Sequence, residues 1–128
     1  MKKLRVLTLD DVTDELLAEC ALARGGASAK SYRCAEPTAV LLPADKVIGP
    51  QRRKLNRDTV VNILNGFRHG HSIPPVEVFY EQETDELILL DGMHRWRASL
   101  AYGFAEIPSV MMTREWAEEF RGYAPPAM

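Results

Sequence analysis

The later half of the chain alternates apolar and polar positions in a way that predicts strands. Two runs, IPPVEVF at 73–79 and ELILLDG at 86–92, flank the polar stretch EQETDE. Strand-like runs around a short polar turn are typical of a hairpin or of two neighbouring strands. The shorter run IPSVMMT at 107–113 predicts one more strand, and AVLL before Pro43 predicts another.

Two segments carry the helical period instead. The first covers residues 56–70, where Asn56 or Asp58 can cap the start and Gly70 can end the helix. Its apolar residues recur at i, i+3, i+4 and i+7, namely Val60, Ile63, Leu64 and Phe67. The second covers residues 93–103 and ends at Gly103. We expect Met93, Trp96 and Leu100 on its buried stripe, with Arg95, Ser99 and Tyr102 opposite.

The two ends of the chain are less regular. A short strand is expected at residues 4–9, followed by a helix over 10–26 that Gly25 stops. The apolar stripe of that helix would be Val12, Leu16, Cys20 and Ala23. Residues 25–39 are small and polar and predict a connecting loop, and the tail 114–128 predicts one or two amphipathic turns.

Composition narrows the class of protein. With 128 residues, 46% of them hydrophobic and 27% charged, the chain has the size and composition of one globular domain. No apolar run is long enough for a membrane span, and acidic residues interrupt the N-terminal segment before a signal-peptide core can form, so we expect a cytoplasmic protein without a membrane partner. Cys20 and Cys34 lack a nearby partner motif and are expected to be ordinary reduced thiols.

The charge pattern bears on nucleic-acid binding. A net charge of -2 argues against a protein that coats nucleic acid indiscriminately. The basic residues nevertheless gather in QRRKLNR, FRHGH and HRWR, which leaves room for a local basic patch.

The junction LLDGMHR, residues 89–95, is the best candidate for a site. A helix that begins directly after a strand presents free N–H groups and the positive end of its dipole, where phosphates bind. Gly92 would let the backbone approach a ligand, and His94 and Arg95 would add donors. Asp91 could hold a metal ion attached to the phosphates or simply cap the helix. The plainer alternatives are a surface salt bridge for Arg95 and a structural role for His94.

Two motifs together resemble a known family. GPQRRKL at 49–55 is similar to the proline-glutamine-arginine box of ParB partition proteins, and GMHRWRA at 92–98 is similar to their glycine-x-x-arginine box. With IPPVEV between them, residues 40–113 resemble the N-terminal domain of ParB proteins and the wider ParB/sulfiredoxin superfamily. The resemblance implies an α+β fold with a small mixed sheet and packed helices, here with an extra N-terminal helix.

The resemblance also implies a ligand. Gly92, Met93, His94 and Arg95 would face the phosphates of a nucleoside di- or triphosphate bound with magnesium. The first box, on the other side of the cleft, would contact the nucleotide or DNA through Gln51, Arg52, Arg53 and Lys54. The ParB-like domain would then cover residues 40–113, after an N-terminal extension (1–39). We further expect a homodimer, and a tail (114–128) that packs on or near the core.

Departures from the family pattern limit the chemistry. Met93 and His94 stand where partition proteins usually have glutamate and arginine, which puts CTP hydrolysis in doubt. Met93 also stands where sulfiredoxins have their reactive cysteine, and a thioether cannot form a thiolate, which argues against sulfiredoxin activity. The DGMHR spelling is similar to branches that include ADP- or ATP-dependent serine kinases, in which Asp91 and His94 would matter and Glu77 would serve as base. The plainer alternative for Glu77 is a solvated position on a strand.

These observations leave three functions open. The leading one is a ParB-like protein that binds DNA, nucleotide phosphates or both, in plasmid or chromosome partition or in transcriptional regulation. The alternatives are a magnesium- and nucleotide-dependent kinase of a small molecule and a non-catalytic interaction module, in which Trp116 and Phe120 cover the core or pair with a second copy. A nuclease is disfavoured because acids and histidines do not cluster in the sequence. Whether the protein is an enzyme stays open.

Overall fold

The structure, a computed structural model, describes residues 6–7, 12–27, 38–49 and 55–124. Its strands are β1 (Val6–Leu7), β2 (Val40–Pro43), β3 (Val47–Ile48), β4 (Leu55–Asn56), β5 (Val76–Glu81), β6 (Glu86–Asp91) and β7 (Glu106–Met111). Its helices are α1 (Asp14–Glu19), α2 (Arg57–His69), α3 (Met93–Tyr102) and α4 (Arg114–Arg121), with a 3-10 turn η1 at Ala44–Lys46. The predicted α+β class is confirmed.

Five of the strands form one mixed sheet in the order β2-β7-β5-β6-β3. β5 and β6 pair antiparallel as the predicted hairpin, and β7 lies parallel to β5 on its other side. β2 and β3 form the two edges, antiparallel to β7 and parallel to β6 respectively. Because β6 is an inner strand, its last residue, Asp91, delivers the chain from the middle of the sheet directly into α3.

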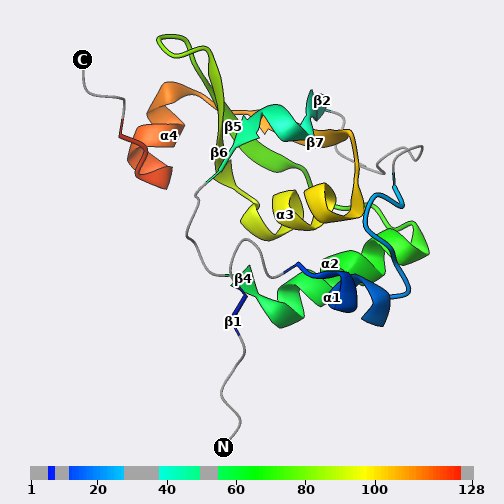
Figure 1. Ribbon diagram of the computed structural model, residues 1–128. Helices are drawn as coiled ribbons and strands as arrows, with labels where there is room; N and C mark the ends of the chain where they lie inside the picture. Colours follow the sequence, from blue (N-terminus) through cyan, green and yellow to red (C-terminus); the bar gives the residue numbers. More distant parts are fainter. Residues whose placement is uncertain (1–5, 8–11, 28–37, 50–54, 125–128) are drawn as a thin grey trace, which may run out of the picture.

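The helix α3 lies between the sheet and α2, as Figure 1 shows, with α1 next to α2. The prediction for its faces is only partly right. Met93 and Trp96 are buried as expected, but Ser99 and Tyr102, which we placed on the polar side, are also buried. The sheet and α2 cover α3 on two sides, so residues on more than one face of the helix are buried. A pattern with a single apolar stripe does not predict this.

The helix α2 follows its predicted pattern closely. Val60 and Leu64 are buried, and Ile63 and Phe67 pack against the same core. Of the two candidate caps, Asn56 is the one used, because its Oδ1 accepts a hydrogen bond from the Thr59 N–H at 3.0 Å. Gly70 ends the helix in the left-handed conformation.

The N-terminal helix is shorter than predicted. It covers Asp14–Glu19, where the sequence indicated a helix over 10–26. Thr13 caps its start, and Ala21 adopts a positive φ of 57°, which turns the chain out of the helix. Val12, Leu16 and Cys20 are nevertheless buried as expected, whereas Ala23, the fourth residue of the predicted stripe, is exposed. The apolar pattern therefore identified most of the buried residues of this segment but overestimated the length of its helix.

Two short strands and one helix complete the described chain. β3 and β4 each have only two residues, too few to leave a period in the sequence. The tail forms the two-turn helix α4 in the predicted amphipathic region, beside the β5–β6 hairpin (Figure 1). None of the helices in the described residues has the length and hydrophobicity needed to cross a membrane.

Candidate functional site

The strand-to-helix junction forms as the sequence predicts. β6 ends at Asp91, Gly92 occupies the N-cap position, and α3 begins at Met93. The cap residue makes no side-chain hydrogen bond to the helix, so the possible capping role of Asp91 is wrong. The first intrahelical bond runs from the Trp96 N–H to the Gly92 carbonyl at 2.9 Å. The N–H groups of the turn before it therefore have no acceptor within the helix.

Gly92 is required at this position for two reasons. Its φ of 99° lies in the left-handed region, which disfavours any residue with a side chain. A Cβ here would also lie 2.6 Å from Cγ1 of Val76 and 3.1 Å from Nη2 of Arg95. The missing side chain thus brings the backbone of the junction close to the Arg95 guanidinium.

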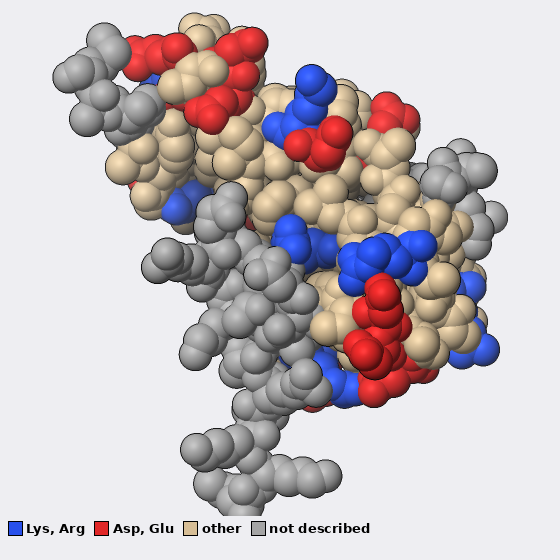
Figure 2. All heavy atoms as spheres, in the orientation of Figure 1, with Lys and Arg blue, Asp and Glu red and all other residues tan. Residues whose placement is uncertain are grey.

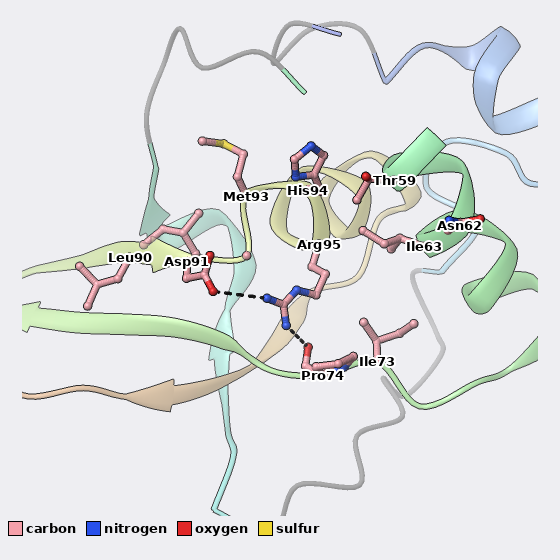
Figure 3. A pocket seen from close by; sticks show the side chains of 12 residues that line it. Thr59, Asn62, Ile63, Ile73, Pro74, Leu90, Asp91, Met93, His94 and Arg95 are labelled. Atoms are coloured by element: carbon pink, nitrogen blue, oxygen red, sulfur yellow. Dashed lines mark hydrogen bonds and ion pairs between the residues drawn. The ribbon is translucent and has the colours of Figure 1, made fainter. Parts of the chain in front are cut away.

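A cavity of about 480 Å³ opens in front of this junction. Figure 3 shows it between the first turns of α2, the start of α3 and the segment that leads into β5. A volume of this size falls in the range of small-molecule sites. The described residues that line it are Thr59, Asn62, Ile63, Ile73, Pro74, Leu89, Leu90, Asp91, Gly92, Met93, His94 and Arg95.

The sequence predicts the wall of this cavity formed by the start of α3, but not the wall formed by α2. All four predicted phosphate-facing residues, Gly92 to Arg95, line it, whereas Thr59, Asn62 and Ile63 of α2 were not singled out. Their spacing of i, i+3 and i+4 places them on one face of α2. That signal was present in the sequence, but the sequence does not say which helix faces which junction.

Arg95 connects two of the segments that form the cavity wall. Its Nη1 donates to the carbonyls of Pro74 at 3.0 Å and Pro75 at 2.7 Å, which ties α3 to the segment before β5. Its Nη2 lies 3.9 Å from Oδ2 of Asp91, as the dashed line in Figure 3 marks. That distance is an ion pair without a close hydrogen bond. Arg95 therefore combines a structural contact with a cation at the helix start.

His94 joins α3 to the start of α2. The Asn56 N–H donates to its Nε2 at 2.8 Å, which makes the imidazole an acceptor at that nitrogen. An imidazole that accepts at Nε2 carries its proton on Nδ1 in the neutral form. The structural role that we weighed for His94 is thus present, alongside its place on the cavity wall.

The two flanks of the first sequence box meet the same helix. A Cβ on Gly49 would lie 2.4 Å from the ring of Trp96, so the chain packs against that ring without a side chain. At the other flank, Asn56 is bonded to His94. Gln51, Arg52, Arg53 and Lys54 lie outside the described residues, and their predicted contacts stay predictions.

Glu77 does not take the place expected of a catalytic base. It is absent from the described cavity lining, and its carboxylate accepts three hydrogen bonds from α4: Trp116 Nε1 at 3.0 Å to Oε1, Arg121 Nε at 2.8 Å to Oε1 and Arg121 Nη2 at 3.0 Å to Oε2. The hydrogen bonds from Arg121 hold the pKa of Glu77 below its ordinary value. A carboxylate with a lowered pKa is a weak proton acceptor, which gives the role of Glu77 as a base no support, and that role stays a prediction.

Asp91 is the exposed carboxylate of the site. Its side chain is 54% exposed and lies between two guanidinium groups, 3.9 Å from Arg95 Nη2 and 3.8 Å from Arg121 Nη2. The described residues hold no group of three or more histidine, cysteine, aspartate or glutamate side chains that could bind a metal ion. A magnesium ion that arrives with phosphates needs only one or two protein carboxylates, and Asp91 fits that requirement.

The described residues that line the cavity include no thiol. The side chain at the start of α3 is Met93, and no cysteine is among the described lining residues. Cys20 is buried beside α1, where burial raises the pKa of its thiol and so disfavours the thiolate. Cys34 lies outside the described residues.

The charged side chains on the surface are mixed in sign. Figure 2 shows Lys and Arg interspersed with Asp and Glu on the face that it presents, and acidic side chains gather near α4 and the tip of the β5–β6 hairpin. Exposed acidic residues of those elements include Glu83, Asp85, Glu115 and Glu118. The described residues drawn on this face therefore form no broad basic surface of the kind that non-specific DNA binding uses.

Comparisons with known proteins agree with this fold. No protein-family model matches the chain. A ParB-like protein from Sulfolobus acidocaldarius is 28% identical over 81 residues, a match that covers 54% of this chain and 39% of that protein. The similarity thus spans well under half the length of this relative.

Solved structures share the architecture at low sequence identity. Sulfiredoxin from Arabidopsis thaliana has a TM-score of 0.52 at 22% identity, over 60% of this chain and 86% of its own. A conserved hypothetical protein from Pyrococcus furiosus has a TM-score of 0.54 at 23% identity, over 68% of this chain and 36% of its own. The chromosome-partitioning protein ParB from Caulobacter crescentus, complexed with CTP-gamma-S, has a TM-score of 0.49 at 18% identity, over 69% and 55%, which is too distant to support a functional argument.

Proposed function

Because this chain has the ParB/sulfiredoxin superfamily fold, we propose that it binds a nucleotide, with the phosphates at the N-terminus of α3. The observation that carries the proposal is the uncapped start of α3 opening onto a cavity of about 480 Å³. First-turn N–H groups and the positive end of the helix dipole favour phosphate there. Arg95 Nη2, next to Gly92, adds a cation on the same side.

The rest of the cavity suits an organic group better than a bare ion. Its walls are largely apolar, with Ile63, Ile73 and Leu90 among the lining residues, and Thr59 and Asn62 supply polar contacts from α2. Binding sites for small molecules commonly combine apolar walls with a few placed polar groups. A base or sugar would lie against this wall, and Asp91 would hold a magnesium ion carried by the phosphates.

DNA is the second candidate ligand, and one observation favours it. The described residues on either side of the basic run Gln51–Lys54 both contact the first turns of α3: Gly49 packs on Trp96, and Asn56 bonds to His94. The described residues that flank the run therefore both lie against the start of α3. Contacts from such a short basic segment would be made mainly to the DNA backbone and would weaken strongly with salt.

The kinase and module alternatives have less support. Phosphoryl transfer needs a group that orients or deprotonates the nucleophile, and the candidate Glu77 is instead paired with Arg121. A pure interaction module would not need a cavity at an uncapped helix start. The roles in partition or transcription and the homodimer stay predictions from the resemblance.

A charge placed in the cavity tests the proposal. Asn62→Glu puts a carboxylate on the wall that faces the helix start, where it should repel phosphates. Asn65→Glu makes the same change on the same helix at a residue outside the described lining and is the control. We expect ADP, ATP or CTP with magnesium to raise the Tm of the unchanged chain and of Asn65→Glu, and to raise that of Asn62→Glu much less.

The alternatives give different results in the same assay. In one such result, a DNA duplex raises the Tm at low salt and not at high salt while no nucleotide raises it. That result would favour binding to the DNA backbone over nucleotide binding. Equal nucleotide shifts in both variants would place the ligand elsewhere. No shift with nucleotide or with DNA would contradict a phosphate site at α3.

A further inference from the structure

The helix α4 brings a second arginine to the edge of the cavity. Arg121, its last residue, places Nη2 3.8 Å from Oδ2 of Asp91, and Arg95 Nη2 lies 3.9 Å from the same oxygen. Asp91 lines the cavity and directly precedes Gly92 at the helix start. Both guanidinium groups therefore lie near the carboxylate at the position where the chain enters the phosphate-binding turn.

The orientation of Arg121 is fixed by Glu77. Its Nε and Nη2 donate to the two carboxylate oxygens of Glu77 at 2.8 and 3.0 Å, a bidentate pair. A guanidinium has five N–H donors, and this pair uses two of them. Within the described part of the chain, the remaining donors of Arg121 have no hydrogen-bond acceptor, and its side chain is 32% exposed. Arg121 is thus held in place but keeps donors for a further oxygen.

The neighbouring contacts keep α4 from moving this arginine away. Trp116 Nε1 also donates to Glu77, and Arg121 lies over the Trp116 ring at 5.4 Å. At the other end of the helix, Arg114 Nη2 donates at 2.7 Å to the buried carboxylate of Glu81, which also accepts from Tyr123. Glu77 and Glu81 are four residues apart on β5 and therefore face the same side of the strand. The helix is anchored to the hairpin at both ends.

We propose that Arg121 is a second phosphate-binding residue of this site and sets its preference for ligands with more than one phosphate. The proposal rests on the function proposed above. The first phosphate would bind at the start of α3, beside Arg95. A further phosphate would extend past Asp91 toward Arg121, whose N–H donors not used by Glu77 can bind phosphate oxygens.

The experiment compares mono-, di- and triphosphates of adenosine and cytidine on three versions of the full chain, with magnesium, by isothermal titration. Arg121→Gln removes the charge at the cavity edge. Arg114→Gln removes the matching arginine at the far end of the same helix and is the control for loosening of α4. Because Arg114 neutralises a buried carboxylate, it should loosen α4 at least as much.

We expect Arg121→Gln to weaken di- or triphosphate binding about tenfold, which corresponds to about 1.4 kcal/mol, and to leave monophosphate binding nearly unchanged. Arg114→Gln should keep the preference for the longer phosphate. Equal losses for all phosphate lengths, or the same loss of preference in both variants, would overturn the assignment of Arg121 while leaving the site at α3 in place. No nucleotide binding by the unchanged chain would overturn both proposals.

Discussion

Arg95 bonds to the backbone with one nitrogen of its guanidinium group and faces the cavity with the other. Nη1 donates to two successive carbonyls, those of Pro74 and Pro75, in a segment that has no strand or helix of its own. Proline has no N–H, so these two residues cannot donate to a ladder. The arginine thus supplies donors for two carbonyls of a segment that lies outside the sheet ladder.

We predict that Arg95→Ala lowers the free energy of unfolding by about 2 kcal/mol, because two hydrogen bonds from a charged donor to the backbone are lost. Urea denaturation measures it. Arg68→Ala, an exposed arginine on α2, is the matched control and should change stability by less than about 0.5 kcal/mol. If the two variants unfold alike, Arg95 does not hold the segment before β5.

The site residues could be predicted from the sequence only where the role of a residue depends on its immediate neighbours in the chain. Gly92 was singled out because a glycine would let the backbone approach a ligand, and its φ of 99° gives this position a separate need for glycine. The hydrogen bond from Asn56 to His94 spans 38 positions and leaves no trace in the sequence. Glu77 was offered as a base from the resemblance to serine kinases, and its partners in the structure lie on α4, far along the chain.

At the scale of elements, α4 is attached mainly by polar contacts. Ala117 is its only fully buried residue in the described chain, and Phe120 is 61% exposed. The ion pairs of Arg114 with Glu81 and Arg121 with Glu77 therefore carry much of its attachment to the hairpin. Such an attachment depends on the charge of the two carboxylates.

This dependence predicts an effect of pH. The pKa of Glu77 is lowered in the folded protein from the ordinary value of 4.5, so its pair contributes stability above that value and loses it as the pH falls through the lower folded pKa. Glu77→Gln should thus cost more stability at pH 7 than near the acid end of the range, as measured by urea unfolding at each pH. Glu119→Gln, on the exposed side of α4, should show no such difference; a similar pH dependence in both would argue against the pair.

Among the elements, length and period decided what could be predicted. The helix α2 and the β5–β6 hairpin have a full period and clear caps or turns, and both were predicted with their ends nearly right. β3 and β4 have two residues each and exist only through their partners, Leu87 and Ile88 for β3 and β1 for β4. In α3, packing on two sides overrode the single-stripe pattern.

For the whole molecule, the strand order creates the site. β6 lies inside the sheet, so its end at Asp91 meets the segment before β5 on one side and α2 on the other. Periodicity does not determine strand order, and only the resemblance of the two boxes to a known family anticipated a shared cleft. The division at residues 39 and 113 stays a prediction.

The central claim is that phosphate binds at the start of α3, and amide chemical shifts report on that turn directly. We would titrate the ¹⁵N-labelled chain with ATP, CTP and inorganic phosphate and follow the backbone amides. We expect the largest changes in amide chemical shift at Gly92, Met93 and Arg95, and smaller changes at Thr59 and Asn62 across the cavity. Shifts centred elsewhere, or none in residues 92–95 at saturating nucleotide, would contradict it.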